Sequence, residues 1–144
     1  MKLRLNHIGF ATEDMSEYIK LFGAMGFHDA TDPVESLPQK VSASFVNLSP
    51  ASDVHVELLE SRDPNSPISN FLRKRGEGLH HLCFETDDIQ ETVDALVAKG
   101  IRLLVPPEPA EAYDLNLKRQ CKAATKGAFL MAGKLLIELF EKGR

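Results

Sequence analysis

The feature of this sequence that most constrains its fold is an internal repeat. Residues 6–12 (NHIGFAT) align with residues 80–86 (HHLCFET), and the same spacing carries Asp14 onto Asp88 and Gly26 onto Gly100. Each half therefore predicts a strand, an amphipathic helix that begins after an Asp and ends before a Gly, and further strands.

The later strands of the two halves also match. Residues 56–60 (VELLE) align with residues 137–141 (IELFE), and alternating segments at 41–48 and 127–131 predict one more strand in each half. The second half is the longer one, and its extra residues are expected within 106–125. The predicted fold is α+β, with two βαβββ modules that form a curled mixed sheet. We expect a single domain over 1–144, with modules at about 1–62 and 79–144 and a connecting segment at about 63–78 that contains a short helix at 68–74.

The composition excludes several classes of function. A net charge of −4 and a pI near 5.7 give no reason to expect nucleic acid or an anionic membrane as a partner. No apolar run is long enough to span a bilayer. Residues 2–5 predict a strand rather than a signal peptide, and the two cysteines, Cys83 and Cys121, do not form a disulfide framework. These features favour a cytoplasmic protein.

Strand alternation predicts that four polar residues share one surface. The large apolar residues of each strand should face the helix, so that His7 and His81 face the opposite side. The same argument places Glu57 and Glu138 on that side. A single His or Glu in a strand is usually structural, but four at matching places of a repeat favour a metal site in a central cleft. Two imidazoles and two carboxylates suit one divalent ion of Co, Ni, Zn, Mn or Fe better than Ca²⁺.

With these residues identified, the sequence resembles the vicinal-oxygen-chelate superfamily, also called the glyoxalase/bleomycin resistance/dioxygenase superfamily. Within it, the chain is most similar to the methylmalonyl-CoA epimerases. The resemblance covers nearly the whole chain. Its most specific segments are residues 5–11, 56–60, 66–72, 76–82 and 136–139. The Ser-Pro-Ile segment that leads to Gly-x-Gly and paired histidines is the part most typical of the epimerases.

The resemblance implies a glyoxalase-like fold and an enzyme that acts on a small carboxylated acyl thioester. The metal ligands would be His7, His81 and Glu138, with a Glu or Gln as the fourth ligand at Glu57. Substrate would bind the metal through two oxygens, a carboxylate would remove the proton between two carbonyls, and a second acid would return it. Glu138 is the predicted catalytic ligand. The resemblance also implies a homodimer and a CoA thioester as the small-molecule partner.

The chain departs from the epimerase pattern near the predicted substrate. Gln39 stands where the epimerases have a Glu that is a proposed base, and an amide cannot take a proton. Glu35 is the nearest replacement. Residues 112–116 and 129–134 also differ from the segments that border the substrate in that family. Gln39 and a basic cluster of Lys118, Arg119 and Lys122 are the predicted substrate-binding residues, although a solvated loop is the more common explanation of such a cluster.

Three other functions fit parts of the pattern. A glyoxalase I type lyase, which isomerises a hemithioacetal of a 2-oxoaldehyde and a thiol, also uses two His and two Glu. A non-catalytic binding protein of the resistance type would not need the base that Gln39 removes. An Fe²⁺ dioxygenase would use His7, His81 and Glu138, but Glu57 would fill a position that such enzymes leave open.

Overall fold

The computed structural model describes residues 1–36, 40–48, 53–110 and 126–142. It divides into two compact units, residues 7–80 and residues 81–144 together with 1–6. We call them the first unit and the second unit. The elements are β1 (Arg4–Thr12), α1 (Met15–Ala24), β2 (Val34–Ser36), β3 (Val41–Asn47), β4 (His55–Ser61), α2 (Pro67–Arg75), β5 (Gly78–Glu85), α3 (Ile89–Ala98), β6 (Arg102–Pro109), β7 (Lys126–Ala132) and β8 (Leu135–Glu141).

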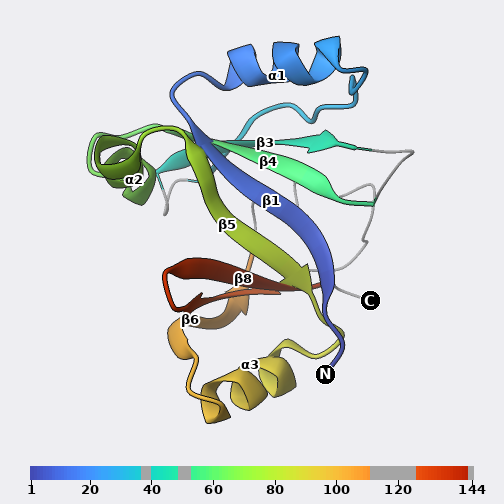
Figure 1. Cartoon of the computed structure of the whole chain (residues 1–144), viewed down its shortest axis with the longest axis vertical. Coiled ribbons are helices and arrows are strands. Elements are labelled where there is room, and N and C mark those ends of the chain that lie inside the picture. The colour runs from blue at the N-terminus through green and yellow to red at the C-terminus, as the bar shows by residue number, and fades with distance from the viewer. Residues whose placement is uncertain (37–39, 49–52, 111–125, 143–144) are drawn as a thin grey trace. The chain divides into compact units, whose positions relative to one another are not determined.

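Both units have the predicted βαβββ order, with α2 as the helix of the connecting segment (Figure 1). The strand order is β2-β3-β4-β1 in the first unit and β5-β8-β7-β6 in the second. β1 pairs with β4 and β5 with β8 in parallel, whereas the neighbours β2–β3, β3–β4, β6–β7 and β7–β8 are antiparallel. The α+β class and the duplicated glyoxalase-like module are thus confirmed. The single domain with module borders near 62 and 79 stays a prediction.

The helix ends follow the predicted signals in both units. Asp14 caps α1 by accepting a hydrogen bond from the backbone N–H of Ser16, and Asp88 caps α3 in the same way from Glu91. After each helix the chain turns at a glycine with positive φ, 99° at Gly26 and 93° at Gly100. A side chain would strain the backbone there, because residues with a Cβ rarely adopt this conformation.

A second carboxylate holds the start of each long helix and was not predicted. Glu60, near the end of β4, accepts a hydrogen bond of 2.7 Å from the N–H of Met15. Glu141, the last residue of β8, accepts one of the same length from the N–H of Ile89. The closing strand of each unit is therefore fastened to the helix of that unit, where the positive end of the helix dipole favours an acid.

Each long helix covers one face of its own sheet. α1 packs on β3 and β4 around Met15, Val46, Val56 and Leu58, and α3 packs on β6, β7 and β8 (Figure 1). The core beneath α3 consists of Ile89, Val93, Ala128, Leu130 and Leu139. The predicted orientation of the apolar residues is correct for Phe10, Val56 and Leu58 in the first unit and for Phe84, Ile137 and Leu139 in the second. The alternate residues of the same strands must consequently face the other side of each sheet.

α2 packs on that other side in the first unit. Its buried residues Ile68 and Leu72 meet Ala11, Ala43 and Leu59, which alternate with the residues beneath α1. The small side chain of Ala11 makes room for this helix. None of the described helices is both long and apolar enough to cross a lipid bilayer.

Glu77, which follows α2, is tied to the start of α1. Its carboxylate accepts hydrogen bonds from the Thr12 hydroxyl at 2.7 Å, the Glu13 N–H at 2.8 Å and the Tyr18 hydroxyl at 3.0 Å. These donors favour the charged form, and the bond from Thr12 contributes most to lowering the pKa of Glu77. The same carboxylate raises the pKa of Tyr18.

We expect Glu77→Gln to lower the Tm by about 1–3 °C at neutral pH, a small effect because the side chain is exposed. A carboxyl group with a lowered pKa in the folded state stabilises the fold above its ordinary value of 4.5, and that contribution is lost as the pH falls through the lowered value. The difference in Tm between wild type and variant should therefore shrink below pH 4.5. Thermal unfolding across pH 2.5–8 measures it, and a difference that grows as the solution is acidified would contradict this assignment.

Candidate metal centre

The first unit holds one of the two predicted His–Glu pairs. His7 Nε2 lies 3.4 Å from Glu57 Oε1, and both side chains are buried, with 0% and 7% of the residue exposed. Glu57 on β4 stands beside Gly9 on β1 in the parallel register, and His7 is one alternation step earlier on the same face. This face is the one opposite α1, as the alternation of the strands predicted.

The second unit repeats the arrangement. His81 Nε2 lies 3.5 Å from Glu138 Oε1, and the two residues are 3% and 4% exposed. Glu138 stands beside Cys83 on β5, and His81 is again one alternation step earlier. The structure thus brings each predicted ligand together with the partner from its own module. Burying two carboxylates is costly unless a cation or hydrogen bonds compensate them.

The chemistry and spacing of both pairs fit a divalent metal ion. Nitrogen–oxygen distances of 3.4 and 3.5 Å exceed the roughly 2.7–2.9 Å of a charge-assisted hydrogen bond. Two ligand atoms that are each about 2.1 Å from one ion, at an angle close to tetrahedral, are about 3.4 Å apart. Each pair is therefore spaced as two neighbouring ligands of a single ion would be.

Each His also contacts a phenylalanine that the sequence did not single out. The ring centroids of His7 and Phe45 are 5.4 Å apart with the planes at 87°, and those of His81 and Phe129 are 6.2 Å apart at 81°. Phe45 pairs with Glu57 across β3 and β4, and Phe129 pairs with Glu138 across β7 and β8. The repeat could have revealed them, but only with the register of these strands in hand.

Glu35, the predicted replacement base, is not brought together with the His–Glu pair of its unit. It lies on β2 opposite Ser42, whose neighbour on β4 is Glu60. By alternation this is the face that α1 covers. Its carboxylate lies 3.4 Å from Arg62 Nε with 57% of the side chain exposed. The other predicted substrate-binding residues, Gln39, Lys118, Arg119 and Lys122, lie outside the described residues.

Two further polar residues lie on the same face of β5 as His81. Cys83 is fully buried and free of any disulfide. Glu85 lies within 3.4 Å of donors from three residues, Arg4 at 3.2 Å, Asn6 at 3.4 Å and Lys142 at 3.3 Å. Through these contacts the Glu85 carboxylate holds the N-terminal residues against β5 within the second unit.

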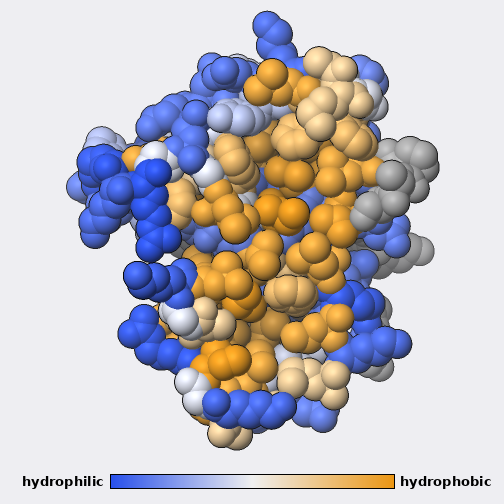
Figure 2. Space-filling view, in the orientation of Figure 1, coloured by the Kyte–Doolittle hydropathy of each residue, from blue (hydrophilic) through white to orange (hydrophobic). Residues whose placement is uncertain are grey.

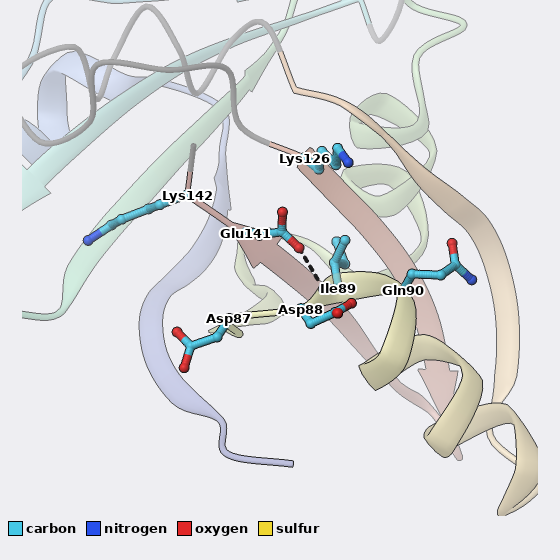
Figure 3. Close-up of a pocket in the computed structure, with 7 residues that line it drawn as sticks. All are labelled: Asp87, Asp88, Ile89, Gln90, Lys126, Glu141 and Lys142. Carbon is cyan, nitrogen blue, oxygen red and sulfur yellow. Dashed lines mark hydrogen bonds between the residues drawn. The ribbon is translucent and has the colours of Figure 1, made fainter. Parts of the chain in front are cut away.

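A depression of about 280 Å³ in the second unit lies apart from His81 and Glu138. Its lining comes from Asp87, Asp88, Ile89, Gln90, Lys126, Glu141 and Lys142 (Figure 3). Among these residues, Glu141 points its carboxylate to the start of α3, where it accepts the hydrogen bond from the Ile89 N–H. The backbone donor that could have bound an anion there is already satisfied, so the depression reflects helix capping.

The family model described as Glyoxalase/Bleomycin resistance protein/Dioxygenase superfamily matches residues 6–116. The chain is 36% identical over 111 residues to the mitochondrial methylmalonyl-CoA epimerase of Dictyostelium discoideum, a match that covers 76% of this chain and 65% of that protein. It is 32% identical over 111 residues to the ethylmalonyl-CoA/methylmalonyl-CoA epimerase of Cereibacter sphaeroides, covering 74% and 78% of the two chains.

The fold matches a solved structure over almost its whole length. The crystal structure of methylmalonyl-CoA epimerase from Mycobacterium tuberculosis superposes with a TM-score of 0.79 at 24% identity, covering 97% of this chain and 88% of that one. Such a likeness establishes the fold. The duplicated module, the matched family model and the similarity to these relatives agree, and the chain belongs to the glyoxalase/bleomycin resistance protein/dioxygenase superfamily.

Proposed function

We propose that this protein is a metal-dependent epimerase of a small carboxylated acyl thioester, with methylmalonyl-CoA as the substrate to test first. The observation that carries the proposal is the duplicated buried His–Glu pair, His7 with Glu57 and His81 with Glu138. The names of the relatives supply the substrate class. The matched region spans only 65% of the Dictyostelium protein, so its activity is carried over here as a proposal.

We propose that the two pairs hold one divalent cation, with Co²⁺, Ni²⁺, Zn²⁺ or Mn²⁺ as the candidates. The four side chains would hold the ion, and a divalent ion of this kind would also bind oxygens of the substrate. When bound, the ion supplies positive charge beside the oxygens on which negative charge develops after proton removal. The imidazole Nε2 atoms and the carboxylate Oε1 atoms are the proposed donors, because these atoms face each other within each pair.

The protein itself must move one proton away from the carbon between the two carbonyls and return one to the opposite face. We propose the Glu138 carboxylate as one of the two proton carriers, since it is 4% exposed and shielded from water. The candidates for the second carrier are Glu35 and a group near Gln39. Lys118, Arg119 and Lys122 are proposed to bind the phosphates or carboxylate of the substrate, because these cations cluster in an acidic chain.

The decisive experiment is exchange of the substrate's α-proton with solvent. Metal-loaded protein in D₂O should incorporate deuterium into methylmalonyl-CoA, which mass spectrometry measures. Protein whose metal has been removed with a chelator should not. Protein that holds its metal stoichiometrically and yet leaves the α-proton in place would overturn the epimerase proposal.

Replacing Glu35 tests the base. If Glu35 removes the proton, Glu35→Gln should slow exchange by about a hundredfold or more. If it is only the partner of Arg62 at the surface, the variant should differ from wild type by less than about twofold, and Arg62→Gln should behave in the same way. The face on which β2 places Glu35 favours the second outcome.

A glyoxalase I type activity is the second candidate, and the carboxylate at position 57 favours it. That branch uses two His and two Glu, whereas the epimerases accept Glu or Gln at this position. The test is to follow hemithioacetal isomerisation with methylglyoxal and glutathione on the same metal-loaded sample. Turnover of the hemithioacetal without exchange of the thioester would select this function over the epimerase.

We also propose a homodimer and a cytoplasmic location. Exposed apolar side chains support a partner surface. In the second unit they include Leu3 and Leu5, which are 37% and 39% exposed, and Figure 2 shows apolar side chains on the viewed face of each unit. The location is proposed from the sequence, whose two cysteines do not form a disulfide framework. Light scattering of the purified protein tests the dimer.

A further inference from the structure

We propose that Phe45 and Phe129 are positioning residues that set the ring planes of His7 and His81 for metal binding. The inference rests on the proposed function, because it takes these two histidines as ligands. It assigns a task to two aromatic side chains that would otherwise be counted only as core.

The contacts are of one kind in both units. Phe45 meets His7 at 87° with centroids 5.4 Å apart, and Phe129 meets His81 at 81° with centroids 6.2 Å apart. Perpendicular ring pairs in this distance range are favourable, since the positive edge of one ring meets the negative face of the other. Rotation of the imidazole about its own side-chain axis would break the perpendicular arrangement.

The register shows that the two phenylalanines occupy equivalent places. Phe45 pairs directly with Glu57, and Phe129 pairs directly with Glu138. Each unit thus places His, Glu and Phe on three adjacent strands, with the Glu on the middle one. Each Phe ring therefore reaches over the strand that bears the Glu to meet the imidazole on the strand beyond.

The position two residues before the paired Glu differs between the units. The repeated set of His, Glu and Phe is therefore distinct from the packing around it. Two residues before the paired Glu, the first unit has His55 and the second has Leu136. Phe45 also contacts the His55 ring at 6.4 Å and 83°, and only 2% of Phe45 is exposed. The phenyl ring is thus held between two imidazoles in one unit, while the contact between Phe and the proposed ligand is present in both.

Orientation matters because an imidazole nitrogen donates its lone pair in the plane of the ring. A ligand ring that rotates freely loses entropy on binding and spends time pointing away from the ion, which weakens the complex. Perpendicular packing against a phenyl ring, buried at Phe45 and half-buried at Phe129, removes that freedom before the metal arrives. The phenylalanines then act on metal affinity through the histidines without touching the ion or the substrate.

The test is to replace each ring with an aliphatic side chain and titrate the metal-free protein with Co²⁺ by calorimetry. Phe45→Leu and Phe129→Leu should each weaken Co²⁺ binding by about tenfold and alter the visible absorption bands of the bound ion. Phe129→Tyr keeps the ring and should bind Co²⁺ as tightly as wild type. Phe22→Leu is the matched control, because it removes a ring with an edge contact to Phe27, 6.4 Å away at 62° on the helix side of the sheet, and should leave the affinity unchanged.

Thermal unfolding of the same metal-free variants separates orientation from stability. If Phe22→Leu lowers the Tm as much as the other two and only those two lose affinity, the proposal holds. Unchanged Co²⁺ affinity and spectra in Phe45→Leu and Phe129→Leu would overturn it while leaving the epimerase proposal intact. Weakened binding in a protein that exchanges no α-proton would support the positioning role and reject only the substrate reaction.

Discussion

Replacing His81 or His7 with alanine is expected to lower kcat/KM for the thioester by about a thousandfold or more. Loss of one of four ligands weakens the hold on the ion, and the charge that it supplies to the developing enolate is worth several kcal/mol, which corresponds to a thousandfold at about 4 kcal/mol. Both histidines are buried against a carboxylate of their own unit, so the two variants should behave alike.

The measurements are α-proton exchange in D₂O and metal content after gel filtration. His28→Ala is the control, because His28 is exposed in the segment that follows α1 and belongs to neither pair. It should keep wild-type rate and metal content. A His81→Ala protein that retains both stoichiometric metal and most of its activity would refute the four-ligand centre.

The second large effect is expected from Glu138→Gln. The effect of Glu57→Gln, the equivalent change in the first unit, should be far smaller. Glu138→Gln should reduce α-proton exchange by at least about a hundredfold, since it removes both a charged ligand and a proposed proton carrier. Glu57→Gln should cost less than about tenfold, because epimerases of this superfamily accept Glu or Gln as the fourth ligand. The two carboxylates have nearly the same surroundings in their units, with 7% and 4% exposure.

This contrast is measured by exchange rates for both variants at saturating metal, which corrects for weaker binding. Equal losses in the two variants would show that the residues share one role as ligands and that Glu138 does not carry the proton. A wild-type rate in Glu138→Gln would remove it from the reaction altogether. The glyoxalase I alternative predicts that Glu57→Gln is as damaging as Glu138→Gln.

Much of the fold could be predicted because the sequence contains it twice. The Asp and Gly signals at the ends of the long helices are local, and a helix cap depends on residues only a few positions away. Alternation correctly assigned the two faces of β1, β4 and β8. The large apolar residues at 8 and 10, at 56 and 58, and at 137 and 139 must face the helix to be buried. The glyoxalase-like fold then followed from the repeat and the resemblance.

The features that the sequence could not give depend on pairing between distant strands. The contact of Phe45 with His7 requires the register of β3 against β4, and nothing near residue 45 specifies it. The face of Glu35 depends on a strand of only three residues, too short for a periodic pattern. The helix at 68–74 was predicted, but its apolar residues do not say which side of the sheet they cover.

The acid at or near the end of each closing strand has a consequence for assembly of the proposed centre. Glu57 and Glu60 lie three positions apart on β4, as do Glu138 and Glu141 on β8, so the two acids of each strand point to opposite faces. A slip of one residue in the pairing would exchange these faces, burying the helix-capping acid without a donor and turning the ligand acid toward the helix. Docking of the helix therefore checks the alignment of the same strand that carries the proposed metal ligand.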